Sequence, residues 1–235
     1  MLDADEAIAI EPALAGARGI AGVVHSPEAA VGDPWRFATG LLDVLRTHHD
    51  IDARFGFDLQ SLRRAGAPWR VQARNGDEVS VPQVVVCAGI GSKALLRPLG
   101  VRVPLMAVKG YSFTAPCGAV APSASITDTA RKLVFCRLGD RIRVAGLADL
   151  NHWDAAPDRA RVADPVAMAR DSLPQAADYD AIESDWAGLR PMTPWSSPII
   201  RRASDGLVLN IGHGMLGWTL AMGCGERAAA LVVDR

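Results

Sequence analysis

The spacing of apolar and polar residues predicts helices and strands at both ends of the chain. Apolar residues recur at helical spacing over residues 35–49, which predicts an amphipathic helix. The pair Asn75-Gly76 separates two extended runs, a pattern typical of a β-hairpin. Residues 84–87 are continuously apolar and mostly β-branched, which predicts a strand buried on both faces.

The middle of the chain has a different pattern. Residues 101–116 and 132–149 are rich in strand-forming residues, with a turn at Gly139, and predict antiparallel strands. A helix is predicted within residues 164–175, and the C-terminal residues 206–235 predict a strand, a glycine loop and a helix. The order indicates a fold of class α/β plus α+β, in which a β-rich insert interrupts an α/β layer.

Charge and composition exclude several classes of function. The 25 basic and 26 acidic residues give a net charge of -1, so nothing favours nucleic-acid binding. The cysteines form no CxxC pair, and neither they nor the aspartates have the spacing of metal ligands, so no metal site and no disulfide framework is expected. The start of the chain is acidic, and no apolar run approaches the length of a membrane span. We expect a cytoplasmic protein that acts on small molecules, or one peripheral on the inner face of the plasma membrane.

Two glycine patterns each follow a predicted strand. The first, Gly89-x-Gly91-x-x-Ala94, precedes a helix that Pro98 cuts short, and no acidic residue follows at the distance that a ribose-binding residue requires. We interpret it as a tight turn between a strand and a helix.

The second pattern, Gly212-x-Gly214-x-x-Gly217, precedes the C-terminal helix. No strand follows to complete a dinucleotide-binding βαβ unit. Small residues let a ligand approach the backbone, and a helix N-terminus favours negative charge. With His213 and Trp218 beside the glycines, the pattern favours a ligand contact over a purely structural loop.

A single arginine, Arg190, stands between apolar and proline neighbours on an extended segment. Its planar guanidinium would suit bidentate recognition of a carboxylate. A structural ion pair is an equally good interpretation of this residue from the pattern alone.

Taken together, five stretches resemble the D-amino-acid dehydrogenase small-subunit family of flavoproteins, which is related to glycine and D-amino-acid oxidases. In chain order they are EPALAG, VPLMAVKGYSFT, DRIRVAGLAD, GLRPMTPWSSPII and LNIGHGMLGWTLAMGCGE. The resemblance implies a partial FAD-binding layer of glutathione-reductase type and an antiparallel, β-rich substrate domain. It assigns residues 1–100 to the FAD-binding part and the start of the substrate region, 101–187 to the substrate domain and 188–235 to a C-terminal FAD-binding segment.

The resemblance also implies a reaction. A D-amino acid is oxidised by hydride transfer to FAD, and the imino acid hydrolyses to a 2-oxo acid and ammonia. The electrons pass to a respiratory-chain acceptor. Arg190 would bind the substrate carboxylate, and Tyr111 would face the substrate. The residues implied at the flavin are Gly212, His213, Gly214, Gly217 and Trp218, with Ala88 and Gly89 near the cofactor.

One part of the family pattern is missing. Nothing before Ala30 supplies the initial strand and G-x-G-x-x-G loop that hold the FAD pyrophosphate. We therefore expect an N-terminally truncated chain that binds FAD weakly or not at all by itself. Three alternatives remain open: a glycine- or sarcosine-type amine oxidase, an inactive remnant, and a module completed by a separate chain.

Overall fold

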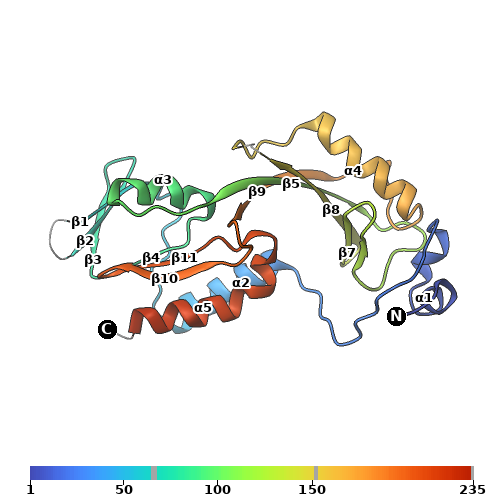
Figure 1. The fold of residues 1–235 in the computed structure, drawn as a ribbon, viewed down its shortest axis with the longest axis horizontal. Helices are drawn as coiled ribbons and strands as arrows, with labels where there is room; N and C mark the ends of the chain where they lie inside the picture. The colour runs from blue at the N-terminus through green and yellow to red at the C-terminus, as the bar shows by residue number, and fades with distance from the viewer. Residues whose placement is uncertain (65–67, 151–152, 234–235) are drawn as a thin grey trace. The chain divides into compact units, whose positions relative to one another are not determined.

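The computed structural model describes residues 1–64, 68–150 and 153–233, and the chain forms two compact units (Figure 1). The first unit comprises Met1–Phe37 and Lys109–Leu189, and the second comprises Ala38–Val108 and Arg190–Arg235. Each unit therefore combines two stretches that are distant in the sequence.

The first unit is built around a five-stranded sheet of order β6-β7-β8-β5-β9. These strands are β5 (Met106–Pro116), β6 (Ile126–Asp128), β7 (Leu133–Leu138), β8 (Arg141–Leu150) and β9 (Ser184–Met192). The predicted turn at Gly139 is confirmed, because β7 and β8 pair in antiparallel register on either side of it. Alternate residues of the strands, among them Phe113, Phe135 and Ile142, form a core with side chains of α4.

Helix α4 (Arg159–Ser172) packs against β8. It begins earlier than the sequence predicts, because the carboxylate of Asp158 caps its N-terminus by accepting from two backbone N–H groups. Its end is as predicted, at Leu173 just before Pro174.

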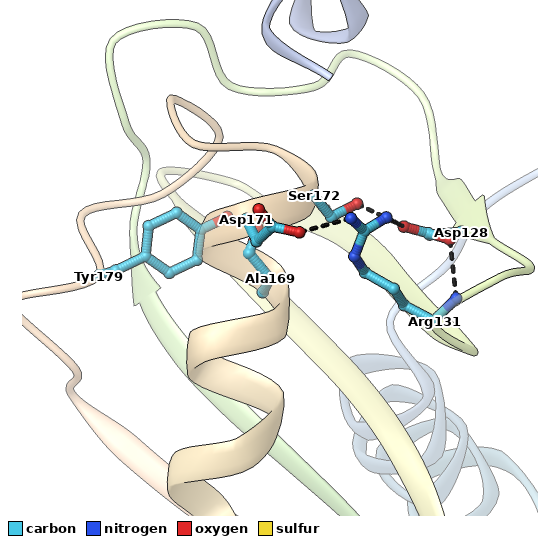
Figure 2. Close-up of polar contacts among 6 residues, drawn as sticks. All are labelled: Asp128, Arg131, Ala169, Asp171, Ser172 and Tyr179. Atoms are coloured by element: carbon cyan, nitrogen blue, oxygen red, sulfur yellow. Dashed lines mark hydrogen bonds and ion pairs between the residues drawn. The ribbon is translucent and has the colours of Figure 1, made fainter. Parts of the chain in front are cut away.

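A polar cluster attaches the end of α4 to the sheet (Figure 2). The Asp128 carboxylate accepts from the guanidinium of Arg131 at 3.0 Å and from the hydroxyl of Ser172 at 2.6 Å, and Arg131 also pairs with Asp171. The Tyr179 hydroxyl donates to main-chain carbonyls at the end of the helix, the nearer at 2.7 Å. All the charges in this cluster are paired with one another, which indicates a structural role.

The N-terminal segment belongs to the first unit. It contains α1 (Ala4–Ile10) and a 3₁₀ turn, η1 (Pro12–Gly16). Residue Glu11 is 6% exposed, and its carboxylate accepts from the backbone N–H groups of Ser123 and Ala124, each at 2.8 Å, and from the Ser123 hydroxyl. These bonds join the N-terminal segment to the loop before β6, and Met1–Phe37 lies in the same unit as the five-stranded sheet. The sequence analysis assigned residues 1–100 to the FAD-binding part and the start of the substrate region. The functional division into three segments stays a prediction.

The second unit contains two three-stranded sheets, of order β1-β2-β3 and β10-β11-β4. Its strands are β1 (Leu59–Arg64), β2 (Trp69–Ala73), β3 (Glu78–Val81), β4 (Val84–Val86), β10 (Ile199–Ser204) and β11 (Leu207–Ile211). The predicted hairpin is confirmed, since β2 and β3 pair antiparallel across Gly76, which has a φ of 95°. Strand β4 runs parallel to β11, which confirms a parallel element formed by two segments that are distant in the sequence.

Among the described residues, two helices pack on these sheets, the short α3 (Ser92–Leu96), continued by the turn η3 (Arg97–Leu99), and α5 (Gly217–Val233). A further helix, α2 (Pro34–His48), begins in the first unit and ends in the second. Helix α5 lies along β10 and β11, as Figure 1 shows. Residues from both sheets and from α3 bury a second core, which includes Trp69, Leu96 and Leu209.

One expectation about burial is wrong. Strand β4 lies at an edge of its sheet, and Val85 is 41% exposed, so the strand is not buried on both faces. The predicted amphipathic helix is confirmed as α2, although it buries none of its residues completely and Leu41 is 41% exposed.

Candidate functional site

The two glycine patterns meet at one edge of the β10-β11-β4 sheet. Strands β4 and β11 are parallel, with Val84 opposite Leu207, so their carboxyl ends lie at the same edge. Ala88 and Gly89 follow β4, and the loop 212–217 follows β11. Ligands of open α/β sheets bind outside the carboxyl ends of parallel strands. The structure therefore brings all the predicted cofactor-binding residues to the same edge.

Two of the loop glycines are required by the packing of the unit itself. Gly212 has a φ of 80° and Gly214 a φ of 55°, both in the region that favours glycine. A Cβ atom on Gly212 would lie 2.7 Å from Cγ2 of Thr193, and one on Gly214 would lie 2.8 Å from Sδ of Met192. A close ligand is not needed to explain glycine at these two positions.

These contacts also join two motifs that are separate in the sequence. Residues 188–194 supply Met192 and Thr193, which pack against the loop 212–217. The Thr193 hydroxyl donates to the carbonyl of Ser197 at 2.8 Å, which closes a tight loop after β9. Arg190, two residues before Met192, is thereby held in the same unit as the glycine loop.

Arg190 is half-buried near the end of β9. Burial lowers the pKa of its guanidinium, although an arginine stays charged at neutral pH. A partly desolvated cation is stabilised by an anion that approaches it, and a carboxylate has the matching planar shape.

His213 is oriented by a residue that the sequence analysis missed. Its Nε2 lies 3.0 Å from Oδ1 of Asn210, a polar residue within the otherwise apolar strand β11. A polar residue within an apolar strand was the feature of the sequence from which this contact could have been predicted. Burial lowers the pKa of His213, so the ring is neutral at neutral pH, and a neutral tautomer that carries the proton on Nε2 can donate to the Asn210 oxygen.

The N-terminus of α5 is open. A 3₁₀ turn, η4 (Gly214–Leu216), leads into Gly217, which has the helical backbone angles φ −54° and ψ −41°. A Cβ atom on Gly217 would meet only Cβ of His213, at an ordinary 3.5 Å. The first turn contains no acidic residue, and Trp218 is 44% exposed. The positive end of this helix therefore has space beside it and no carboxylate in its first turn.

The loop after β4 also has space beside it. Ala88 is exposed, and Gly89 has a φ of 52° with no atom within 4 Å of the point where a Cβ would stand. The following residues form a 3₁₀ turn, η2 (Gly89–Gly91), and then the five-residue helix α3. This short helix agrees with the interpretation of the first glycine pattern as a tight turn.

Tyr111 lies in the first unit, whereas Arg190 lies in the second. Tyr111 is 2% exposed and packs in a cluster with Val162 of α4 and Ala187 of β9. Burial raises the pKa of the Tyr111 hydroxyl, and the nearby carboxylate of Asp149 raises it further.

Grooves occur in both units. One of about 750 Å³ lies along α4 and is lined by five apolar residues and by Arg170, Asp171 and Asp185. Another of about 430 Å³ in the second unit is lined by Arg102, Trp195 and Arg201, beside the loop that follows β9. The sequence analysis predicted neither groove. Within the described ranges no cluster of three or more His, Cys, Asp or Glu residues could hold a metal ion, and no helix is long and apolar enough to cross a membrane.

Comparison with known proteins gives strong matches. The model of the DAO family, FAD dependent oxidoreductase, matches residues 1–231. D-amino acid dehydrogenase 2 of Ralstonia nicotianae is 40% identical over 245 residues, which cover 100% of this chain and 58% of that protein. D-amino acid dehydrogenase 2 of Pseudomonas aeruginosa is 39% identical, with 100% of this chain and 56% of that protein covered. The chain thus spans little more than half the length of these relatives.

Solved structures share the fold. Iminodiacetate oxidase from Chelativorans sp. BNC1 matches with a TM-score of 0.85 and 22% identity, covering 100% of this chain and 63% of that one. L-proline dehydrogenase from P. horikoshii matches with a TM-score of 0.81 and 16% identity. The match covers 99% of this chain and 64% of that one. At these identities the likeness concerns the fold alone.

Proposed function

Because the chain belongs to the FAD dependent oxidoreductase family, we propose that it forms the substrate-binding part and a flavin-contacting part of a D-amino acid dehydrogenase. The substrate is a D-amino acid, which is oxidised to an imino acid that hydrolyses to a 2-oxo acid and ammonia. The observation that carries the proposal is the packing of the segment 188–194 against the glycine loop 212–217, which holds a half-buried arginine and an open helix N-terminus in one unit.

The residues at the sheet edge fit a flavin. Gly217 and Gly89 leave open space, and the first turn of α5 has no acidic residue. FAD, when bound, supplies the hydride acceptor. His213 and Trp218 at the start of α5 would contact the flavin end of the cofactor, with Gly212, Gly214 and Ala88 in the loops beside it. The positive end of the helix would stabilise negative charge on the reduced ring.

Arg190 is the residue proposed to bind the substrate carboxylate. Its guanidinium is partly desolvated, so a carboxylate that pairs with it gains more than at an exposed arginine. Tyr111 is proposed to face the substrate on the resemblance alone, because its side chain is buried within the first unit.

Two further parts of the proposal concern the electron acceptor and the location of the enzyme in the cell. The electrons leave for a respiratory-chain acceptor, as the resemblance to dehydrogenases rather than oxidases implies. Such an acceptor is membrane-bound, so we place the protein in the cytoplasm, with peripheral contact to the inner face of the plasma membrane.

The test compares the chain alone with a chimera that joins it to the remaining parts of the Ralstonia relative. Both proteins are titrated with FAD and then mixed with D-alanine without oxygen. The chimera should bleach the flavin absorbance and release a 2-oxo acid, whereas the isolated chain should bind FAD weakly or not at all. A chimera that binds FAD but leaves it oxidised by every D-amino acid would contradict the proposal.

Variants of the chimera test Arg190. Arg190→Ala should raise KM for D-alanine at least about tenfold, and Arg190→Lys should recover little because the bidentate geometry is lost. Arg201→Ala, at an exposed arginine of β10, is the matched control and should leave KM unchanged. Near-normal kinetics of Arg190→Ala would assign this residue a structural role instead.

A further inference from the structure

A second arginine lies on the face of the five-stranded sheet opposite its core. In β8 the side chains of Ile142 and Val144 are fully buried in the core of the first unit. Because side chains of a strand alternate, Arg143 between them points to the other face. The residue opposite Arg143 in the neighbouring strand β7 is Cys136.

Two neighbours on this face hold the guanidinium of Arg143. Its Nη2 donates to the hydroxyl of Ser112 on β5 at 2.7 Å, and its Cζ lies 5.6 Å from the ring centroid of Trp186 on β9. Trp186 in turn folds over Gly188, where a Cβ atom would lie only 2.0 Å from the indole ring. Glycine at position 188 therefore lets the indole lie against the sheet and support the arginine.

Within the described part of the chain Arg143 forms no ion pair within 4.0 Å. The charge of Asp33 acts on it only from a distance, and that carboxylate already accepts from the backbone N–H groups of Trp35 and Arg36. Arg131, Arg161 and Arg170 of the same unit each pair with an aspartate at 3.0 Å or less. Arg143 has five N–H donors but donates only to Ser112, and burial lowers its pKa. A half-buried cation that is fixed in place and makes no contact ion pair is arranged to accept a carboxylate from outside.

We propose that Arg143 is a carboxylate-binding residue of the first unit, positioned by Ser112 and Trp186. The identity of its ligand rests on the proposed function: the carboxylate is either the α-carboxylate of a D-amino acid or the side-chain carboxylate of an acidic D-amino acid. A planar guanidinium that is held on one edge by a hydroxyl keeps its other edges free for bidentate pairing.

The test is binding to the whole chain, measured by titration calorimetry with D-alanine and D-aspartate. Arg143→Gln and Arg143→Lys should each weaken binding at least about tenfold, because charge is lost in the first and fork geometry in the second. Arg141→Gln is the matched control: it removes a charge from the same strand at an exposed arginine whose ion pairs are 3.8 Å long, and should leave both affinities unchanged.

The two ligands distinguish the two sources of carboxylate. A loss with both ligands assigns Arg143 to the α-carboxylate, and a loss with D-aspartate alone assigns it to an acidic side chain. Affinities that Arg143→Gln and Arg143→Lys leave unchanged, or no binding by the unaltered chain at about 10 mM ligand, would overturn the inference. Ser112→Ala, which removes only the supporting hydroxyl, should weaken binding less and covers the case in which both arginine variants fail to fold.

The outcome is separate from that of the proposed function, because binding is measured without turnover. The isolated chain could bind D-alanine through Arg143 while the chimera never produces a 2-oxo acid. That result would support the role of Arg143 and contradict the proposed dehydrogenase activity. A chimera that oxidises both D-alanine and D-aspartate equally well with and without Arg143 would support the dehydrogenase and contradict this inference.

Discussion

The Met192 sulfur stands 2.8 Å from the point where Gly214 would carry a Cβ atom. This contact joins the end of β9 to the loop that begins α5, across more than twenty residues of sequence. It means that the glycines of one apparent ligand-binding motif divide into two kinds. Gly212 and Gly214 are needed for the fold, whereas the packing of the described residues does not require glycine at position 217.

Gly214→Ala should destabilise the protein by about 2–4 kcal/mol, because a left-handed backbone and a clash with Met192 both oppose the new methyl group. Urea denaturation measures the loss. Adding Met192→Ala should remove the clash but not the strain of the left-handed backbone. The double variant should therefore lose less unfolding free energy than the two single variants lose together. Full additivity would show that Met192 and Gly214 do not compete for space.

Gly217→Ala should leave the fold intact, because the helical backbone and the open space around this residue accept a methyl group. In the chimera it should lower FAD affinity at least about tenfold if the flavin lies against this turn. The control is Gly223→Ala in the same helix, where no atom lies within 4 Å of the new Cβ. It should stabilise the helix by about 0.5–1 kcal/mol and leave flavin binding unchanged. Equal flavin affinity in both variants would place the cofactor elsewhere.

Ser196→Gly should stabilise the second unit by about 0.5–1 kcal/mol. Ser196 adopts a φ of 59° in the loop after β9, a conformation that costs a serine more than a glycine. The expected result is a higher melting temperature by calorimetry. Ser197→Gly, one residue further on and without a positive φ, should lower it slightly through backbone entropy. A lower melting temperature for Ser196→Gly would show that its hydroxyl matters more than its backbone.

Glu11→Gln should destabilise the first unit in a pH-dependent way. Burial would raise the pKa of the Glu11 carboxyl, but hydrogen bonds from Ala124, Ser123 and Ala13 outweigh it and lower the pKa below its usual value. A depressed folded-state pKa stabilises the protein above the unfolded value of about 4.3, and this contribution is lost as pH falls through the lower folded value.

The difference between Glu11→Gln and the parent chain should therefore be about 1–3 kcal/mol at pH 7 and shrink steadily below about pH 4. Urea denaturation at several pH values measures it. Glu28→Gln, at an exposed residue, is the control and should show no such dependence. A difference that stays constant with pH would mean that the lost hydrogen bonds matter but the charge does not.

Local patterns predicted the elements around the site well. The strand, glycine loop and helix at the C-terminus, the hairpin at Gly76 and the turn at Gly139 all follow from signals within a few residues of one another. Burial was predicted less well. Val85 belongs to an apolar run that reads as a central strand, but β4 is an edge strand, because strand order depends on pairing with a segment 120 residues away.

The sequence by itself determined which residues have the chemistry of a site: Arg190 among apolar neighbours, and a glycine loop before an apolar helix. The tertiary structure alone decided how they are used. It placed Met192 and Thr193 against Gly214 and Gly212, Asn210 against His213, and Arg143 on the sheet face away from the core. The physical reason is that these contacts join positions in different strands and loops. Side-chain packing and burial at such positions depend on the whole unit, whereas helix, strand and turn patterns depend on neighbours in sequence.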